Sequence, residues 1–299
     1  MGKSREIKGR IKAVKNIQRI TRTMQMIATS KFSKAQQAAV SSKPYTEGLF
    51  DLVGQLASGS ESLDHPLLSA DGEGANAGEI TLVLTTERGL CGPYNANIIR
   101  TALRHLREHA PATESAGGRV ELVGKKGLAA LKFAKIDIQE HHQQFGDKPA
   151  YEDVDALATS YIDAFTAGEV SAVRVIYMKY ISAGRQVPDV LQLLPFSREA
   201  VEVTDEEAAD AGTLAGYEFS PSGPELLDTL LPAAVKATLF QCFNDAVVSE
   251  HVGRMIAMKS ATDNAKKMGK ALKTRYNRAR QAQITTELTE IVSGAAALG

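Results

Sequence analysis

Both ends of this chain are long stretches that almost lack helix-breaking residues. Residues 10–43 contain neither glycine nor proline, and residues 233–299 contain no proline. Proline and glycine are the residues that most often end or weaken a helix. Two such stretches at opposite ends of one chain predict two long helices that pair antiparallel, with everything else inserted between them. This arrangement favours a mechanical or assembly role over a catalytic one.

The apolar residues of both ends recur at intervals of three or four, which predicts one apolar stripe along each helix. We expect the first helix to run from about residue 4 past residue 32, to pause near Pro44 and to resume to about residue 55. We expect the last helix to begin at Pro224 and to bend at Pro232. The first stripe consists of Ile7, Ile11, Val14, Ile17, Ile20, Met24 and Ile27. The second consists of Val248, Val252, Met255, Met258, Ala265, Met268, Leu272, Tyr276, Ala279, Ile284, Leu288 and Ile291.

Two glycines interrupt the last helix, at Gly253 and Gly269. Each costs about 1 kcal/mol of helix stability relative to alanine. We therefore expect packing against a partner helix, rather than intrinsic propensity, to hold this segment.

The formal net charge of zero hides a strong segregation of charge. Residues 1–36 hold ten basic side chains and one acidic one, and residues 254–280 hold nine and one, so these segments carry +9 and +8. The rest of the chain carries −17. Basic helices on an acidic body indicate an acidic partner for the helices. A solvated charged face is the alternative.

The middle of the chain alternates between short β-branched runs and helical patterns, which predicts an α/β domain with a parallel or mostly parallel sheet. Residues 57–78 are expected to form a linker and residues 199–216 an acidic surface loop. The predicted division is a helical shaft of residues 1–56 and 224–299 and an α/β foot of residues 57–223. Strands are predicted over 79–85, 119–124, 170–180 and 190–194, and helices over 93–110, 125–135 and 151–167.

Composition limits the environment of the chain. Its only cysteines, Cys91 and Cys242, lack metal or redox spacing and indicate a reducing compartment. We find no apolar run that approaches the roughly 20 residues of a membrane span. The N-terminus is too charged for a secretory signal.

Candidate chemical sites are weak. The loops 86–93 and 124–127 each join a strand to a helix, where a doubly wound domain would bind phosphate, but neither has a glycine-rich phosphate motif. His105 and His109 lie four residues apart on a helix, yet no third metal ligand keeps their register, and the His141–His142 pair is equally weak. We therefore predict no cofactor, no metal and no catalytic residue.

The ends of the chain resemble the γ-subunit family of the F-type rotary ATP synthases. The matching motifs are IKxRIxxVKNIQRIT over residues 7–21, RMIAMKxATDNA over 254–265, YNxARQA over 276–282 and ELTEIVSGAAA over 287–297. Between them, RGLCG over residues 88–92, followed by Asn95, is similar to a loop of the family's α/β domain.

The resemblance implies a rotor that makes and breaks no bonds itself. The terminal helices would form a coiled coil inside the ring of α and β subunits, and a Rossmann-like foot would join the ε subunit and the membrane c-ring. Rotation of the c-ring by protons would turn the shaft and drive the β subunits through their conformational cycle. The resemblance places the chain at the cytoplasmic face of the plasma membrane, peripherally attached, with no nucleic acid and no small-molecule substrate of its own.

The resemblance also assigns contact residues. Positions that match contacts to the α and β subunits are Met24, Arg254, Arg280, Gln281, Thr285 and Glu287. Tyr217 and Phe219 fall in a segment that the family places near the ε subunit and the c-ring. Two other classes stay open from the residues alone: a nucleotide-binding α/β enzyme with helical extensions, and a basic coiled coil on nucleic acid.

Overall fold

The computed structural model describes residues 2–59, 65–68, 77–109, 118–196 and 223–298. The chain forms two compact units, the first made of residues 1–30 and 254–299 and the second of residues 31–253. Two long helices contribute to both units, and the shorter elements all belong to the second. The helices are α1 (Gly2–Gly59), α2 (Tyr94–Glu108), α4 (Leu128–Phe133), α5 (Tyr151–Thr166) and α7 (Gly223–Leu298).

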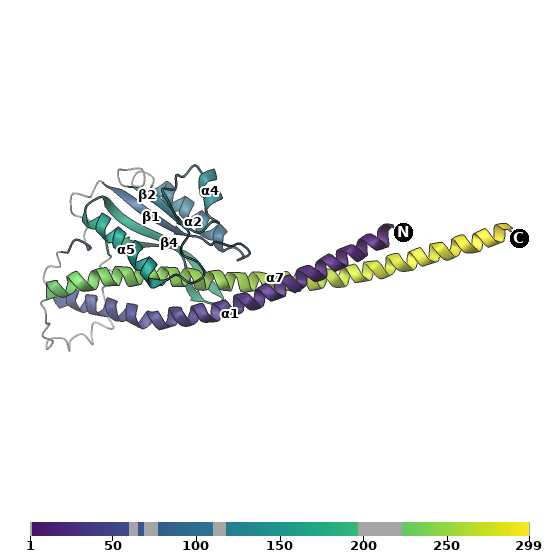
Figure 1. The fold of residues 1–299 in the computed structure, drawn as a ribbon, viewed down its shortest axis with the longest axis horizontal. Coiled ribbons are helices and arrows are strands. Elements are labelled where there is room, and N and C mark those ends of the chain that lie inside the picture. Colours follow the sequence, from purple (N-terminus) through teal and green to yellow (C-terminus); the bar gives the residue numbers. More distant parts are fainter. Residues whose placement is uncertain (1, 60–64, 69–76, 110–117, 197–222, 299) are drawn as a thin grey trace. The chain divides into compact units, whose positions relative to one another are not determined.

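The second unit is built on a five-stranded sheet with the order β3-β2-β1-β4-β5. Figure 1 labels its central strands β2, β1 and β4. Four strands are parallel and β5 pairs antiparallel with β4, so the predicted mostly parallel α/β sheet is confirmed. The strands are β1 (Gly78–Leu84), β2 (Arg119–Val123), β3 (Glu140–His142), β4 (Val170–Ser182) and β5 (Arg185–Leu194).

Each face of the sheet has its own core. Ile98 of α2 and Leu131 of α4 pack with Val83 on one face. Tyr161 of α5 and Leu239 of α7 pack on the other face. Side chains alternate between the two faces of a strand, so neighbouring residues of β1 enter different cores.

The first unit is an antiparallel helix pair. Ser4 Oγ donates to Gln283 Oε1 at 3.0 Å, and Thr262 Oγ1 donates to Thr21 Oγ1 at 2.8 Å. The partner number on α7 falls as the number on α1 rises, which fixes the antiparallel direction. Val14, Ala265 and Leu272 form the buried centre of the pair.

The predicted stripe on the first helix is only partly correct. Ile7 and Ile11 pack against the buried Val14, but Ile17, Ile20 and Ile27 are each more than half exposed. The buried positions farther along α1 are instead Thr21 and Ala28, in heptad register with Val14. Small and polar residues carry this part of the seam, and the large apolar residues lie on a neighbouring, exposed stripe.

Other expectations need correction. The helix α1 runs through Pro44 without the predicted pause, and α7 likewise continues through Pro232. A proline removes one backbone hydrogen bond and can bend a helix without ending it. The predicted helix over 125–135 is confined to the six residues of α4, and the three-residue β3 was missed. The surface loop 199–216 and most of the linker 57–78 lie outside the described residues.

One helix in the described part of the chain, α7, has a window apolar enough to cross a membrane by length and composition. This window is not an uninterrupted apolar run, which is why it was not predicted from the sequence. Core helices of soluble proteins pass the same test, and 44% of this window is buried within the protein. Leu231 and Leu239 of α7 are fully buried in the core of the second unit, which accounts for much of the helix's apolar character.

Buried charges are paired within the sheet. Glu121 of β2 is fully buried and accepts hydrogen bonds from His142 Nε2 at 2.8 Å, the Tyr161 hydroxyl at 2.6 Å and Arg119 Nε at 2.7 Å. Burial alone would raise the pKa of Glu121, but these hydrogen bonds outweigh it and lower the pKa below its usual value. The carboxylate is therefore charged at neutral pH and joins β2, β3 and α5.

The two glycines within α7 predict opposite effects of the same substitution. A Cβ at Gly253 would lie 2.7 Å from the carbonyl oxygen of Cys91, whereas one at Gly269 would lie 3.9 Å from Val14 Cγ1, an ordinary contact. Gly269→Ala should stabilise the chain by about 0.5–1 kcal/mol. Gly253→Ala should destabilise it, because overpacking costs about 1–3 kcal/mol. Chemical denaturation followed by circular dichroism measures both, and shifts of the same sign would contradict the assignment.

The network around Glu121 predicts a specific pH dependence. Because its pKa is lower in the folded state, its contribution to stability is complete above the unfolded-state pKa and is lost as the pH falls through the folded-state pKa. Glu121→Gln should cost about 1.5–3 kcal/mol at neutral pH and flatten the acid side of the stability curve. Denaturation at several pH values tests this. A variant that loses the same stability at every pH would show that charge is not the cause.

Candidate functional site

The sheet has the topology in which α/β proteins usually bind ligands. The chain proceeds from β1 to β2 and β3 on one side of β1, then crosses to β4 on its other side. In open sheets of this kind, ligands bind outside the carboxyl ends of the strands where the order reverses. In this sheet that position is the carboxyl end of β1, next to β4.

In this protein, the helix α7 occupies that position. Ser249 Oγ of α7 donates to the carbonyl oxygen of Met178 on β4 at 3.2 Å. Asp245 of the same helix accepts from the backbone N–H of Tyr180 at 3.4 Å. One turn beyond Ser249, Gly253 lies against the carbonyl oxygen of Cys91 in the loop that follows β1. The helix fills the space where a ligand of a doubly wound domain would lie.

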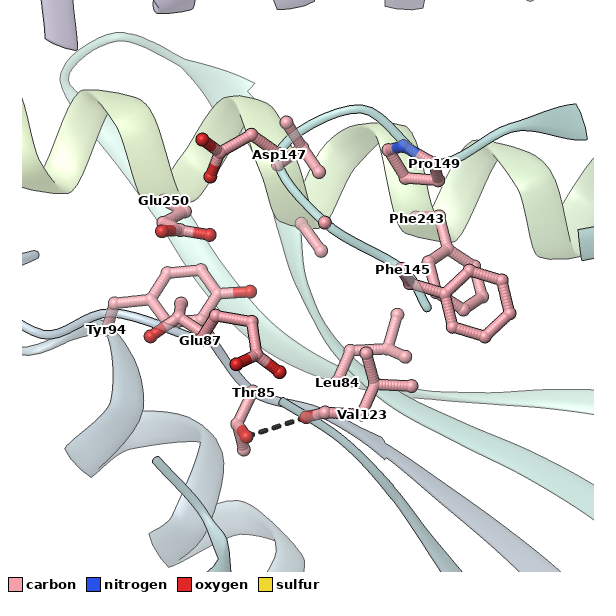
Figure 2. Close-up of a pocket in the computed structure, with 14 residues that line it drawn as sticks. Leu84, Thr85, Glu87, Tyr94, Val123, Phe145, Asp147, Pro149, Phe243 and Glu250 are labelled. Carbon is pink, nitrogen blue, oxygen red and sulfur yellow. Dashed lines mark hydrogen bonds between the residues drawn. The ribbon is translucent and has the colours of Figure 1, made fainter. Parts of the chain in front are cut away.

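A cavity of about 30 Å³ remains beside α7 at the ends of β1 and β2. Figure 2 shows the carboxylates of Asp147, Glu250 and Glu87 on one side of it and the rings of Phe145 and Phe243 on the other. Since about 10–15 Å³ of such volume holds one water, the cavity has room for two or three waters. It is far too small for a nucleotide.

The loop after β1 is closed by its own hydrogen bonds. The backbone N–H of Thr86 donates to Asn95 Oδ1 at 3.1 Å, and Asn95 Nδ2 donates to Thr86 Oγ1 at 2.8 Å. Asn95 Nδ2 also donates to Cys91 Sγ at 3.2 Å. Leu90 and Gly92 both have positive φ, at 65° and 64°, as this tight loop requires. Cys91, only 1% exposed, is a packed residue of this loop.

The loop after β2 is equally closed. A Cβ on Gly124 would lie 2.5 Å from the carbonyl oxygen of Thr85, and this glycine has a φ of 81°. The N–H of Gly127 donates to Thr85 Oγ1 at 3.1 Å, and the N–H of Lys126 donates to the Thr86 carbonyl at 3.0 Å. These amides already have protein acceptors, so they do not form a phosphate-binding loop.

The histidines that the sequence analysis considered and rejected as metal ligands form hydrogen bonds within the protein. His105 Nε2 lies 3.0 Å from Glu79 Oε1, and the His105 and His109 rings stack with centroids 4.1 Å apart. Sequence reasoning missed Glu79 because it lies 26 residues before His105 and on another element.

One group of residues has the composition of a metal site. Ligand atoms of Glu121, Glu140 and His142 lie within 4.8 Å of one another. The carboxylate of Glu121 already accepts hydrogen bonds from His142, Tyr161 and Arg119, so its oxygens have protein partners.

The residues that the resemblance assigned to partner contacts lie mostly on exposed surfaces of the first unit. Arg280, Gln281, Thr285 and Glu287 are exposed on α7, and Met24 is half-buried on α1. Thr285 Oγ1 donates to the Gln281 carbonyl at 3.0 Å, and Glu287 accepts from Gln283 Nε2 at 2.8 Å.

Arg254 differs from the others, since it is only 9% exposed. Little of its side chain is therefore available at the surface. Tyr217 and Phe219 lie outside the described residues.

The end of the apolar stripe that was predicted on the last helix is the most exposed apolar surface of the first unit in the described residues. Ser4 of α1 lies beside Gln283, and α7 continues to Leu298. Along this last part, Ile284, Leu288, Ile291 and Val292 form a stripe in which each side chain is 48–68% exposed. The unpaired end of α7 therefore presents an apolar face to its surroundings.

Comparison with known proteins identifies the family. A family model described as ATP synthase matches residues 3–298. The ATP synthase gamma chain of Rhodopirellula baltica is 42% identical over all of this chain and 99% of its own length. That of Delftia acidovorans is 37% identical over the full length of both.

Solved structures show the same fold at lower identity. A chain of the Euglena gracilis mitochondrial ATP synthase, in a structure of its OSCP, F1 and c-ring parts, aligns with a TM-score of 0.63 at 16% identity, over 99% of this chain and 95% of that one. A chain of the Tetrahymena thermophila mitochondrial ATP synthase, in a structure of the central stalk and c-ring, aligns with a TM-score of 0.54 at 17% identity, over 81% and 99%. The chain therefore belongs to the ATP synthase gamma-chain family, the family of the enzyme's central-stalk subunit.

Proposed function

We propose that this chain is the rotating shaft of a proton-driven ATP synthase and carries out no chemical step itself. Rotation of the membrane c-ring would turn the α/β unit, and the helix pair would impose that rotation on the catalytic β subunits. The observation that carries the proposal is the form of α7. It is a core helix of one unit, a paired helix of the other and an unpaired apolar helix at its end.

The charge of the first unit supports contact with acidic partners. Residues 1–30 and 254–299 together hold 17 basic and 4 acidic side chains, a net charge of +13. We propose that acidic loops of the α and β subunits surround this unit. Exposed ion pairs contribute about 0–1 kcal/mol each, so such contacts can form and break as the shaft turns.

The unpaired end of α7 suits a bearing. Its exposed stripe of Ile284, Leu288, Ile291 and Val292 can be covered by an apolar sleeve, and non-directional apolar contacts do not fix one rotational position. We propose that the α and β subunits form this sleeve. The ε subunit and c-ring would bind the α/β unit, which attaches the chain peripherally to the cytoplasmic face of the membrane.

The unequal lengths of α1 and α7 explain how one shaft can distinguish identical subunits. Where both helices are present the cross-section is a pair, and beyond Gln283 it is a single helix. Met24 lies on the shorter helix, whereas Arg280, Gln281, Thr285 and Glu287 lie on the longer one. A subunit that faces one side of the pair therefore meets different side chains from a subunit that faces the other.

The first prediction concerns the exposed contacts. Replacing Arg280 and Gln281 together with alanine should lower ATP turnover of the reconstituted complex about two- to tenfold, because two polar contacts of up to about 1 kcal/mol each are removed. The same dipeptide, Arg185–Gln186, occurs in the turn region between β4 and β5 and provides a matched control. Its double alanine variant should turn over ATP normally. Unchanged turnover in both variants would remove these residues from the contact surface.

The second prediction concerns the isolated chain. Because α7 fills the ligand position of the sheet and the remaining cavity is about 30 Å³, the purified chain should neither hydrolyse ATP nor bind nucleotides. Calorimetry with ATP, NAD and FAD tests this. Micromolar binding or robust turnover would favour the alternative of a nucleotide-binding α/β enzyme.

A further inference from the structure

The two long helices are held by the second unit in different ways. The helix α7 contributes to the buried core from Leu227 to Ala246, over five turns. In the described residues, α1 contributes only Leu49 and Val53 to the same core. Its part nearest the first unit, which begins at Lys31, therefore depends on other contacts.

Those contacts lie within the first turn of α1 in this unit. Lys31 Nζ donates a hydrogen bond to Asp147 Oδ2, which lies in the loop between β3 and α5. Arg88 Nη1 of the loop after β1 lies 3.8 Å from the same oxygen. The neighbouring ring of Phe32 lies 6.3 Å from the ring of Tyr180, at the end of β4.

The ion pair is partly shielded and charged at neutral pH. The side chains of Lys31 and Asp147 are 38% and 30% exposed. Burial would raise the pKa of Asp147, but the hydrogen bond from Lys31 and the nearby charges of Lys31, Arg88 and His251 lower it below its usual value.

The loop that carries Arg88 is tied to α7 as well. The loop after β1 is braced by Asn95 and touches α7 where the Cys91 carbonyl meets Gly253. Gly253 is the last residue of α7 in this unit, as Lys31 is the first of α1. The contacts Gly253–Cys91, Arg88–Asp147 and Asp147–Lys31 thus form a collar that links both helices to the sheet where they leave the unit.

We propose that the Lys31–Asp147 ion pair is a torque lock: it keeps α1 in register with the α/β unit when the shaft turns against a load. The proposal rests on the proposed function. The core of the second unit holds α7 from Leu227 to Ala246, so this part of α7 follows the sheet without further contacts. Near Lys31 the start of α1 is only half-buried, and its first buried residue in this unit is Ala39. The ion pair and the ring contact act on this stretch, and a directed ion pair resists sliding and twisting in a way that a smooth apolar contact does not. These residues position the shaft and touch no substrate.

The test compares loaded and unloaded rotation in the assembled complex. Lys31→Gln and Asp147→Asn, reconstituted with the α, β and remaining subunits in lipid vesicles, should hydrolyse ATP at the wild-type rate when no proton gradient opposes them. The number of protons pumped per ATP against an imposed gradient should fall about two- to fivefold, as expected for loss of one partly shielded ion pair. Lys34→Gln removes an exposed lysine from the same helix and should leave both quantities unchanged.

Exchanging the two charges distinguishes loss of the ion pair from a general destabilisation of the chain. Lys31→Asp combined with Asp147→Lys restores an ion pair, and Arg88→Gln in the same variant keeps the new lysine from facing a second cation. This variant should recover most of the pumping ratio, whereas a purely structural defect would persist. Thermal denaturation of each variant chain gives its stability independently. A normal pumping ratio in both single variants, or no recovery in the exchange variant, would overturn the lock. A wild-type chain that supports no ATP-driven pumping would overturn the proposed function itself. That result can be told apart from both outcomes that would overturn the lock.

Discussion

One continuous helix, α7, passes through three different environments: a buried core, a helix pair and an exposed end. The rest of the structure depends on how its surface changes between them. Near its start it is a core helix, with Leu231 and Leu239 fully buried. In the middle it keeps a narrow seam, where Ala265 and Leu272 pack beside Val14. At its end the stripe around Leu288 is exposed. The buried part of the helix thus narrows steadily toward the C-terminus, and this change of surface divides the chain into two units.

The same helix explains why a sheet of nucleotide-binding topology holds no nucleotide-sized site in the described residues. Ser249 and Asp245 of α7 bond to the end of β4, and Gly253 allows the helix to approach the loop after β1. The carboxyl edge of the sheet, which commonly binds ligands in this topology, here binds a helix. The edge has the tight loops and positive-φ residues that are typical of ligand sites, but here the loop after β1 contacts α7. In this protein, a sheet edge that commonly binds ligands connects the sheet to α7.

The sequence allowed the helix pair, the mostly parallel sheet and the family to be predicted, since long-range periodicity and motifs carry them. It did not show which side of α1 forms the seam. Ile17 and Ile20 are more apolar than Thr21, yet Thr21 is buried, because the position of the partner helix and not side-chain size decides the seam. The Glu121–His142 and Glu79–His105 pairs were also hidden, because each joins residues that only the fold brings together. The contact role of Arg280 and Gln281 still rests on the resemblance.

A shaft that turns inside other subunits needs an outer surface that binds those subunits weakly. Its two helices must also be held firmly by the rest of its own chain. The outer surface of the first unit meets the first demand, since its large apolar side chains are isolated in narrow stripes and its charges are exposed and mostly of one sign. The second demand is met differently for each helix, by a long core for α7 and by a directed ion pair for α1. If both helices were buried equally, the apolar core alone would be enough to hold them to the sheet. Among the side chains that the structure describes, the shorter helix contributes fewer buried residues to the second unit. Its connection to the sheet is therefore where a shaft of this kind is expected to slip first.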